Sequence, residues 1–286
     1  ILLCFKKKIY LNTRWLKNFL ISYCTTNNLL QSKKIRSYLS ELNNNDILYF
    51  YWGSGAADII PFLGKIKAKK IIRLHGGDLY EERNNGYIPI RENLLKHIDL
   101  AVFISLQGKL YLKRKYPKIK FNSILSYLGT NNHGISKRSN DKIFRILSCS
   151  FVSPVKRIHL IYNAFQLITD YEIEWTHIGG GKGFKDLKSL TINSRNNIKV
   201  KLLGDFSNKE VMDYYKTKNI DAFINVSSSE GLPVSLMEAI SFNIPVIGTD
   251  VGGSSEIVTP TTGVLLNSDP TEIEIIAAIN KVRKYR

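Results

Sequence analysis

Short apolar runs alternate with longer amphipathic runs from about residue 46 to the end of the chain. An apolar run of four to eight residues bounded by polar residues is typical of a buried strand, whereas apolar positions spaced by three or four indicate a helix. Strands are predicted at residues 46–52, 69–75, 99–105, 144–150, 173–179, 198–204, 221–226, 244–249 and 263–266. This alternation predicts βαβ units, and therefore an α/β fold with parallel sheets.

The helices of the second half are predicted near residues 156–169, 207–217, 233–242 and 270–284. Residues 11–42 are also helical in pattern, as one helix or as two. Residues 128–141 read LGTNNHGISKRSND, a polar and turn-rich segment that predicts a linker. We therefore expect two facing, doubly wound, Rossmann-like domains, one over residues 1–135 and one over residues 136–286.

The composition of the 286 residues, 44% hydrophobic and 11% aromatic, is that of a globular protein and excludes a disordered one. The charge is uneven, because residues 1–140 carry 24 − 8 = +16 and residues 141–286 carry 17 − 16 = +1. A basic half attracts nucleic acid, phosphorylated substrates or an acidic membrane surface. A merely well-solvated surface explains the charge equally well.

The cysteines and the apolar runs indicate in which cellular compartment the protein is expected. Cys4, Cys24 and Cys149 have no paired spacing, so they predict neither a disulfide framework nor a zinc site, and they fit a cytoplasmic protein. No apolar run reaches the roughly 18 residues of a membrane-spanning helix, and the opening residues lack the order of a signal peptide. Because the chain begins at Ile1, we expect it to be a segment of a longer protein.

The segment SSSEGLPVSLMEAISFNIPVIGTD places two carboxylates around a turn. Glu230 follows a predicted strand, in the region where ligands of parallel sheets bind. Pro233 suits a first helical residue, so the helix should begin near Leu232, with Glu238 on its second turn. Gly231 permits close approach of a ligand, and the free N–H groups of the helix start suit a phosphate.

Two carboxylates beside an anion-binding helix start are suited to accept hydrogen bonds from sugar hydroxyls. The alternative is that Glu230 is a solvated loop residue and Glu238 a residue of the helix surface. The spacing alone leaves both interpretations open.

A longer stretch, SEGLPVSLMEAISFNIPVIGTDVGGSSEIV, resembles the signature of family 4 retaining glycosyltransferases of the GT-B fold. That signature has two glutamates separated by seven residues, then a Pro-Val strand and a Gly-Gly turn. Looser similarities are SCSFVSPVKRIHLIYNAFQLI to the first strand and basic loop of the donor domain, WTHIGGGKG to its Gly-rich second loop, and RLHGGDLY to a strand end of the acceptor domain. The resemblance spans most of residues 46–270.

The resemblance implies roles for the residues of this signature. Glu230 and the backbone of Gly231, Leu232 and Pro233 would hold the donor sugar and the distal phosphate. Glu238 would accept hydrogen bonds from the ribose hydroxyls.

It also implies that Lys156, with Arg157, neutralises the diphosphate leaving group. The family usually has an arginine about six residues before this lysine, where this chain has Ser150 or Phe151. Whether Arg157 replaces that arginine stays open, so Lys156 is the firmer candidate.

Three further positions are candidates. GGGKG, with Gly180 as the donor-contacting residue, matches neither the phosphate-loop nor the dinucleotide pattern, so a plain turn is an equal alternative. His75 resembles the acceptor-side histidine of the family, although a lone histidine is more often structural, and Asp78 is a weaker candidate. The remaining histidines lack metal-ligand spacing, so we expect no metal and no cofactor.

The segment GKLYLKRKYPKIK, residues 108–120, interleaves basic residues with tyrosines. This pattern fits an anionic lipid surface or a solvated helix face, and it fits nucleic acid less well.

The function expected from these features is retaining transfer of a sugar from a nucleotide-diphosphate sugar to an acceptor hydroxyl, in bacterial surface-polysaccharide biosynthesis. The acceptor would be a glycan or a lipid-linked glycan, and the protein would be cytoplasmic and peripheral on the inner face of the cell membrane. Alternatives are a nucleotide-sugar epimerase of the same fold, or a basic non-catalytic nucleotide- or nucleic-acid-binding protein. Residues 1–45 lack the strand and Gly-rich loop that open the family, so we expect an N-terminally truncated first domain.

Overall fold

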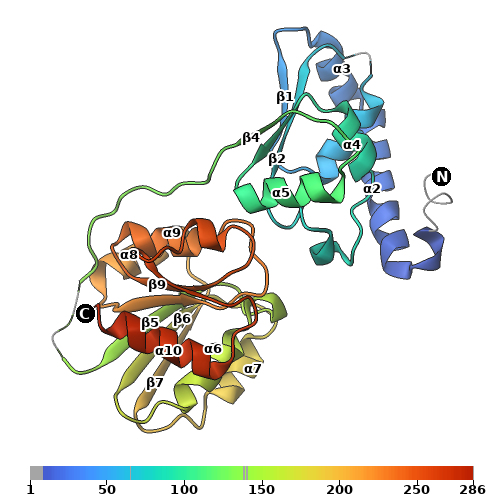
Figure 1. Cartoon of the computed structure of the whole chain (residues 1–286). Coiled ribbons are helices and arrows are strands. Elements are labelled where there is room, and N and C mark those ends of the chain that lie inside the picture. Colours follow the sequence, from blue (N-terminus) through green and yellow to red (C-terminus); the bar gives the residue numbers. More distant parts are fainter. Residues whose placement is uncertain (1–8, 65, 138, 140, 286) are drawn as a thin grey trace. The chain divides into compact units, whose positions relative to one another are not determined.

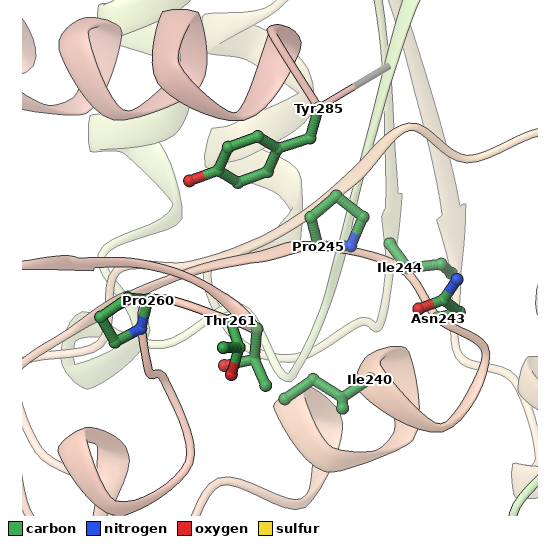
Figure 2. Close-up of a pocket in the computed structure, with 8 residues that line it drawn as sticks. Ile240, Asn243, Ile244, Pro245, Pro260, Thr261 and Tyr285 are labelled. Atoms are coloured by element: carbon green, nitrogen blue, oxygen red, sulfur yellow. The ribbon is translucent and has the colours of Figure 1, made fainter.

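The computed structural model describes residues 9–64, 66–137, 139 and 141–285. Its contacts divide the chain into two compact units, Ile1–Tyr127 and Leu128–Arg286. Each unit is built around one parallel sheet (Figure 1). The α/β class and the parallel sheets predicted from the sequence are therefore confirmed.

The sheet of the first unit has four strands in the order β1-β2-β3-β4. The elements of this unit are η1 (Ile9–Leu11), α2 (Thr13–Gln31), α3 (Lys33–Glu41), β1 (Ile47–Phe50), η2 (Gly55–Phe62), β2 (Lys69–Leu74), η3 (Glu81–Asn84), α4 (Arg91–His97), β3 (Leu100–Phe103), α5 (Leu106–Lys115) and β4 (Ser123–Leu125). The helical pattern of residues 11–42 is two helices, because Ser32 ends α2 and its hydroxyl caps α3 by accepting from the Ile35 N–H.

The helices of the first unit cover one face of its sheet. Each strand lies beside the preceding one, and right-handed crossovers that progress in one direction place every connection on the same face. On that face the sheet packs against η2, α4 and α5 through Ile72, Leu74 and Phe103. On the other face Ile47 and Tyr49 are exposed. Among the described residues, the helices of the first unit therefore pack on the face of the sheet that carries Ile72, Leu74 and Phe103.

The sheet of the second unit has six strands in the order β10-β9-β8-β5-β6-β7. Its elements are β5 (Phe144–Cys149), η4 (Pro154–Lys156), α6 (Ile158–Gln166), β6 (Ile173–Ile178), α7 (Phe184–Leu190), β7 (Ile198–Gly204), α8 (Asn208–Thr217), β8 (Ala222–Asn225), α9 (Val234–Ser241), β9 (Val246–Thr249), η5 (Ser254–Glu256), β10 (Gly263–Leu266) and α10 (Glu272–Arg283). All six strands predicted from the sequence of this half are present.

Helices cover both faces of the second sheet, α6 and α10 on one face and α8 and α9 on the other (Figure 1). Two separate apolar cores result, one with Trp175 and Phe165 and the other with Tyr215 and Phe242. The strand order reverses between β5 and β8, because β6 and β7 extend the sheet on one side and β9 and β10 on the other. The loops after β5 and β8 therefore diverge, and the crevice between them is where doubly wound sheets bind ligands.

The division between the units falls between residues 127 and 128, whereas the boundary predicted from the sequence is between 135 and 136. The residues of the predicted linker belong to the second unit because their backbone N–H groups hydrogen-bond to carbonyls at the end of α9. The His133 N–H donates to the Ser241 carbonyl at 3.2 Å, and the Ser136 N–H donates to the Phe242 carbonyl at 2.9 Å.

Candidate active site

The β5–β8 crevice of the second unit brings together Lys156 and Glu230, which are 74 residues apart in sequence. Lys156 ends η4, the short turn after β5, and Glu230 lies in the loop after β8. The Lys156 ammonium donates to Glu230 Oε1 at 2.6 Å. The two residues that the resemblance assigns to the leaving group and to the donor sugar are therefore in direct contact.

The carboxylate of Glu230 is almost buried, with 8% of the residue exposed. The Asn225 side-chain amide donates to Oε1 at 3.2 Å. That amide is itself oriented, because its oxygen accepts from the backbone N–H and the hydroxyl of Ser227. Burial raises the pKa of Glu230, but the Lys156 charge and the hydrogen bonds outweigh burial and hold the pKa below its usual value. Glu230 is therefore a fixed anion at neutral pH.

The Gly-Gly turn after β9 supports the loop that carries Glu230. Gly252 has a φ of +55°, and a Cβ at this position would lie 1.9 Å from the Glu230 carbonyl oxygen. The next residue, Gly253, donates its N–H to the Gly231 carbonyl at 2.8 Å. Only a residue without a side chain fits at 252, since backbone atoms occupy the space of a Cβ.

Helix α9 begins at Val234, two residues later than predicted, and Pro233 is its N-cap and not its first residue. The extended ψ of 100° at Pro233 excludes it from the helix, although its carbonyl accepts from the Leu236 N–H at 3.1 Å. Glu230 and Gly231 lie in the preceding loop, as expected.

Glu238 lies on the second turn of α9 and is half-buried. The Asn208 side-chain amide, at the start of α8, donates to Glu238 Oε1 at 3.1 Å. Burial raises the pKa of Glu238, and Asn208 and His133 lower it in part, so the pKa stays above its usual value. Glu238 is therefore a half-buried residue of α9 with a hydrogen-bond partner on α8.

The Arg157 guanidinium is bound by backbone carbonyls and by one carboxylate of the second unit. Its guanidinium donates to the carbonyls of Val226, Ser227 and Ser268 at 2.8, 3.0 and 2.8 Å, and pairs with Asp269 at 2.7 Å. It thereby ties the end of β8 to the segment after β10. A contact of Arg157 with a diphosphate stays a prediction.

The Gly-rich loop that contains Gly180 is packed against the loop after β5. The Gly180 N–H donates to Asp205 Oδ1 at 2.7 Å, and its carbonyl accepts from the Val152 N–H at 2.6 Å. A Cβ at Gly179, where φ is +129°, would lie 2.0 Å from the Ser150 carbonyl oxygen. The plain turn, the alternative interpretation of this loop, accounts for these contacts.

His75 and Asp78 lie at the end of β2 in the first unit. The Asp78 carboxylate accepts from the His75 N–H at 2.8 Å and from the Gly53 N–H at 2.6 Å, so it joins the ends of β2 and β1. Asp78 is thus a structural residue in this unit. The His75 imidazole is buried, and neither ring nitrogen has a hydrogen-bond partner among the described residues.

Asn225 and Asn208 were not identified by sequence reasoning, although each donates a hydrogen bond to one of the two carboxylates. A signal existed for Asn225, since an amide that ends a buried strand is unusual. No local pattern distinguishes Asn208 from other polar residues that begin a helix.

Neither a metal site nor a membrane span is found in the part of the chain that the structure describes. No group of three or more His, Cys, Asp and Glu residues in this part could hold a metal ion. No helix within the described ranges has both the length and the apolarity to cross a bilayer.

Several known proteins are similar to this chain in sequence. A family model described as "Glycosyl transferases group 1" matches residues 131–285. An uncharacterized glycosyltransferase of Methanocaldococcus jannaschii, MJ1178, is 27% identical over 89% of this chain and 69% of its own length. The O-antigen biosynthesis glycosyltransferase WbnH of Escherichia coli is 30% identical, over 49% of this chain and 37% of its own length.

Two solved structures share the fold. The apo form of the lipopolysaccharide outer core galactosyltransferase WaaB has a TM-score of 0.74 at 19% identity, over 94% of this chain and 76% of WaaB. Anabaena HepE in complex with UDP has a TM-score of 0.65 at 17% identity, over 84% of this chain and 69% of HepE. The family model covers more than half of the chain, including the segments that carry Lys156, Glu230 and Glu238, and the chain therefore belongs to the group 1 family of glycosyl transferases.

Proposed function

We propose that the protein transfers a sugar from a nucleotide-diphosphate sugar to an acceptor hydroxyl with retention of anomeric configuration. The Lys156–Glu230 contact at the strand-order reversal of the second sheet carries this proposal. A cation and a buried anion at this position suit a donor that has a sugar next to a diphosphate. The relative HepE was solved with UDP, which makes UDP the first nucleotide to test.

The mechanism is one in which charge develops on the diphosphate as the bond from the anomeric carbon to the phosphate oxygen breaks. Lys156 is fixed at the crevice before the reaction, so it stabilises this charge with little reorganisation. The acceptor oxygen attacks from the face that the phosphate leaves, and its proton passes to the departing phosphate oxygen. Glu230 is already paired with Lys156 and Asn225, so we assign it to holding sugar hydroxyls and not to nucleophilic attack.

The remaining donor contacts follow from the geometry of α9. The backbone of Gly231, Leu232 and Pro233 leads into the positive end of this helix and binds the distal phosphate. Glu238, held by Asn208, accepts hydrogen bonds from the ribose. Because Lys156 supplies the positive charge, we propose that transfer needs no metal ion and no cofactor.

We assign the acceptor to the basic first unit and propose a glycan or lipid-linked glycan of surface-polysaccharide biosynthesis. Helix α5 exposes Leu106 and Leu110 together with Lys113 and Arg114. Apolar and basic side chains exposed on one helix suit the surface of an anionic bilayer. This surface would hold the protein on the inner face of the cell membrane.

Calorimetric titration with UDP, GDP and their sugars tests the donor side. Binding of at least one nucleoside diphosphate, with an affinity that salt changes little, supports the proposal. Release of an isomeric nucleotide sugar without an acceptor would instead indicate an epimerase. Binding to nucleic acid alone, steeply weakened by salt, would indicate the nucleic-acid-binding alternative.

A further inference from the structure

Two exposed aromatic side chains lie directly after β1, at the carboxyl end of the first sheet. Tyr51 and Trp52 are 52% and 51% exposed. Their rings meet edge to face, with centroids 6.0 Å apart at 80°. Large aromatic side chains are usually buried, and two adjacent exposed ones at the ligand-binding end of a parallel sheet require an explanation.

The imidazole of His75 supports both rings. Its centroid lies 4.8 Å from that of Tyr51 and 4.3 Å from that of Trp52. His75 is only 8% exposed, and both ring nitrogens lack a hydrogen-bond partner among the described residues. The Asp78 carboxylate, at 4.0 Å from Nδ1, is too distant to be one. The imidazole is therefore a buried ring against which both exposed aromatic side chains pack.

The three rings stand on a rigid base. Asp78 joins the backbones of Gly53 and His75, and the buried Arg91 guanidinium donates to the Asp78 carbonyl. A Cβ at Gly53 would lie 2.3 Å from Leu74 Cδ2, so the chain after Trp52 is closely packed. The aromatic surface is therefore present before a ligand binds, which lowers the cost of ordering it.

We infer that Tyr51 and Trp52 form a stacking surface for a pyranose ring of the acceptor. The C–H groups on one face of a pyranose carry partial positive charge, and the face of an aromatic ring is negative. This inference rests on the proposed function and narrows it, because the acceptor then ends in a sugar and not in a peptide side chain or a bare lipid phosphate.

The experiment titrates the full chain, without nucleotide, with methyl glycosides of the common pyranoses up to about 50 mM. Mannitol is the control, because it has hydroxyls but no ring. Saturation-transfer NMR reports which sugar protons approach the protein. We expect at least one pyranoside to bind through the C–H groups of one face and mannitol not to bind. Equal signals from mannitol, or no binding by any pyranoside, would overturn the inference.

Variants locate the binding surface. Trp52→Ala should weaken pyranoside binding at least tenfold, and Trp52→Phe should stay within about threefold of the wild type. Tyr38→Ala removes an equally exposed tyrosine from α3 and should change nothing. If Trp52→Ala bound pyranosides as the wild type does, or if Tyr38→Ala lost as much affinity, Tyr51 and Trp52 would not be the stacking surface.

His75→Phe tests whether the buried ring acts through packing. It keeps a ring against Tyr51 and Trp52 and removes the two unpartnered nitrogens, so the melting temperature should not fall and pyranoside binding should stay within about threefold of the wild type. Loss of pyranoside binding at an unchanged melting temperature would show that stacking on Tyr51 and Trp52 is not sufficient for binding. Nucleotide affinity, measured in parallel, should be unchanged in all variants. If nucleotides bind and pyranosides do not, only the acceptor inference fails; if nucleotides do not bind, the proposed function fails.

Discussion

At the scale of single residues, the two opposite charges of the candidate donor site are paired with each other in the structure. Lys156 is paired with Glu230, and Asn225 supplies a further hydrogen bond to the same oxygen. Removing one member of a nearly buried pair leaves the other charge without compensation, so single substitutions should have large effects.

Lys156→Ala should lower turnover by roughly 10²–10³-fold, the usual effect of deleting one preorganised group that stabilises developing charge. Without the ammonium, burial should raise the pKa of Glu230, so the acidic limb of the pH–rate profile should move to higher pH. Steady-state rates measured across pH check both effects. Lys281→Ala, an exposed lysine of α10, is the control, and full activity of Lys156→Ala would remove this residue from the mechanism.

Glu230→Gln and Glu238→Gln should impair different properties of the enzyme, turnover in the first and nucleotide affinity in the second. Glu230 is assigned to the transferred sugar, so its amide variant should lower kcat and bind a bare nucleoside diphosphate nearly as the wild type does. Glu238 is assigned to the ribose, so its variant should weaken the bare nucleotide by about 1.5–3 kcal/mol. Calorimetry with UDP and GDP distinguishes them. Undiminished nucleotide binding by Glu238→Gln would show that the ribose assignment is wrong.

At the scale of elements, the turn after β9 fixes the loop after β8. Gly252→Ala should displace Glu230, because the new Cβ would overlap a backbone oxygen that cannot rotate away. We expect a loss of at least about 1 kcal/mol in the unfolding free energy and weaker donor binding. Gly134→Ala is the matched control, since Gly134 also has a positive φ, +92°, but nothing within 4 Å of its Cβ position. Equal nucleotide affinity in both variants would contradict the proposed support.

The contact between α2 and η2 contains a buried carboxyl. Asp58 is 3% exposed, accepts from the Ser22 hydroxyl at 2.6 Å, and has its pKa raised by burial to about 6. The folded state therefore binds the proton more tightly than the unfolded state, so stability is lost as pH rises from about 4 to above 6.

Asp58→Asn should remove this loss. Relative to the wild type, the variant's unfolding free energy should be higher by less than ~1 kcal/mol at pH 4 and by roughly 3 kcal/mol at pH 8. Denaturant unfolding of the first unit at several pH values measures it. A gain that does not change with pH would mean that the carboxyl does not titrate in this range.

At the scale of the whole molecule, the positive charge is concentrated in residues 1–140, at +16 of the total +17. The chain should sediment with phosphatidylglycerol vesicles and not with phosphatidylcholine vesicles, and added salt should release it. Substituting Lys113 and Arg114 by alanine should weaken sedimentation, whereas the same change at Lys209 and Lys216 of α8 should not. Equal binding to both vesicle types would refute an electrostatic attachment.

The sequence by itself determined the parallel sheets and the location of the two glutamates. Buried parallel strands are continuous apolar runs, so their positions can be predicted from local composition. The sequence pattern did not predict β4 or α7, because these elements, with three and seven residues, are too short to show a hydrophobic period. It also placed Glu230 in a loop and Glu238 in a helix correctly, since Gly-Leu-Pro is a local signal.

The tertiary structure alone decided the partners of these residues. Three contacts join residues that are far apart in the chain. Lys156 pairs with Glu230, Arg157 pairs with Asp269, and His75 packs against Trp52. Such contacts depend on which strands become neighbours and on which face each crossover lies, and no local pattern encodes that choice. The order of the strands also produced the reversal in the second sheet, beside which the candidate donor site lies.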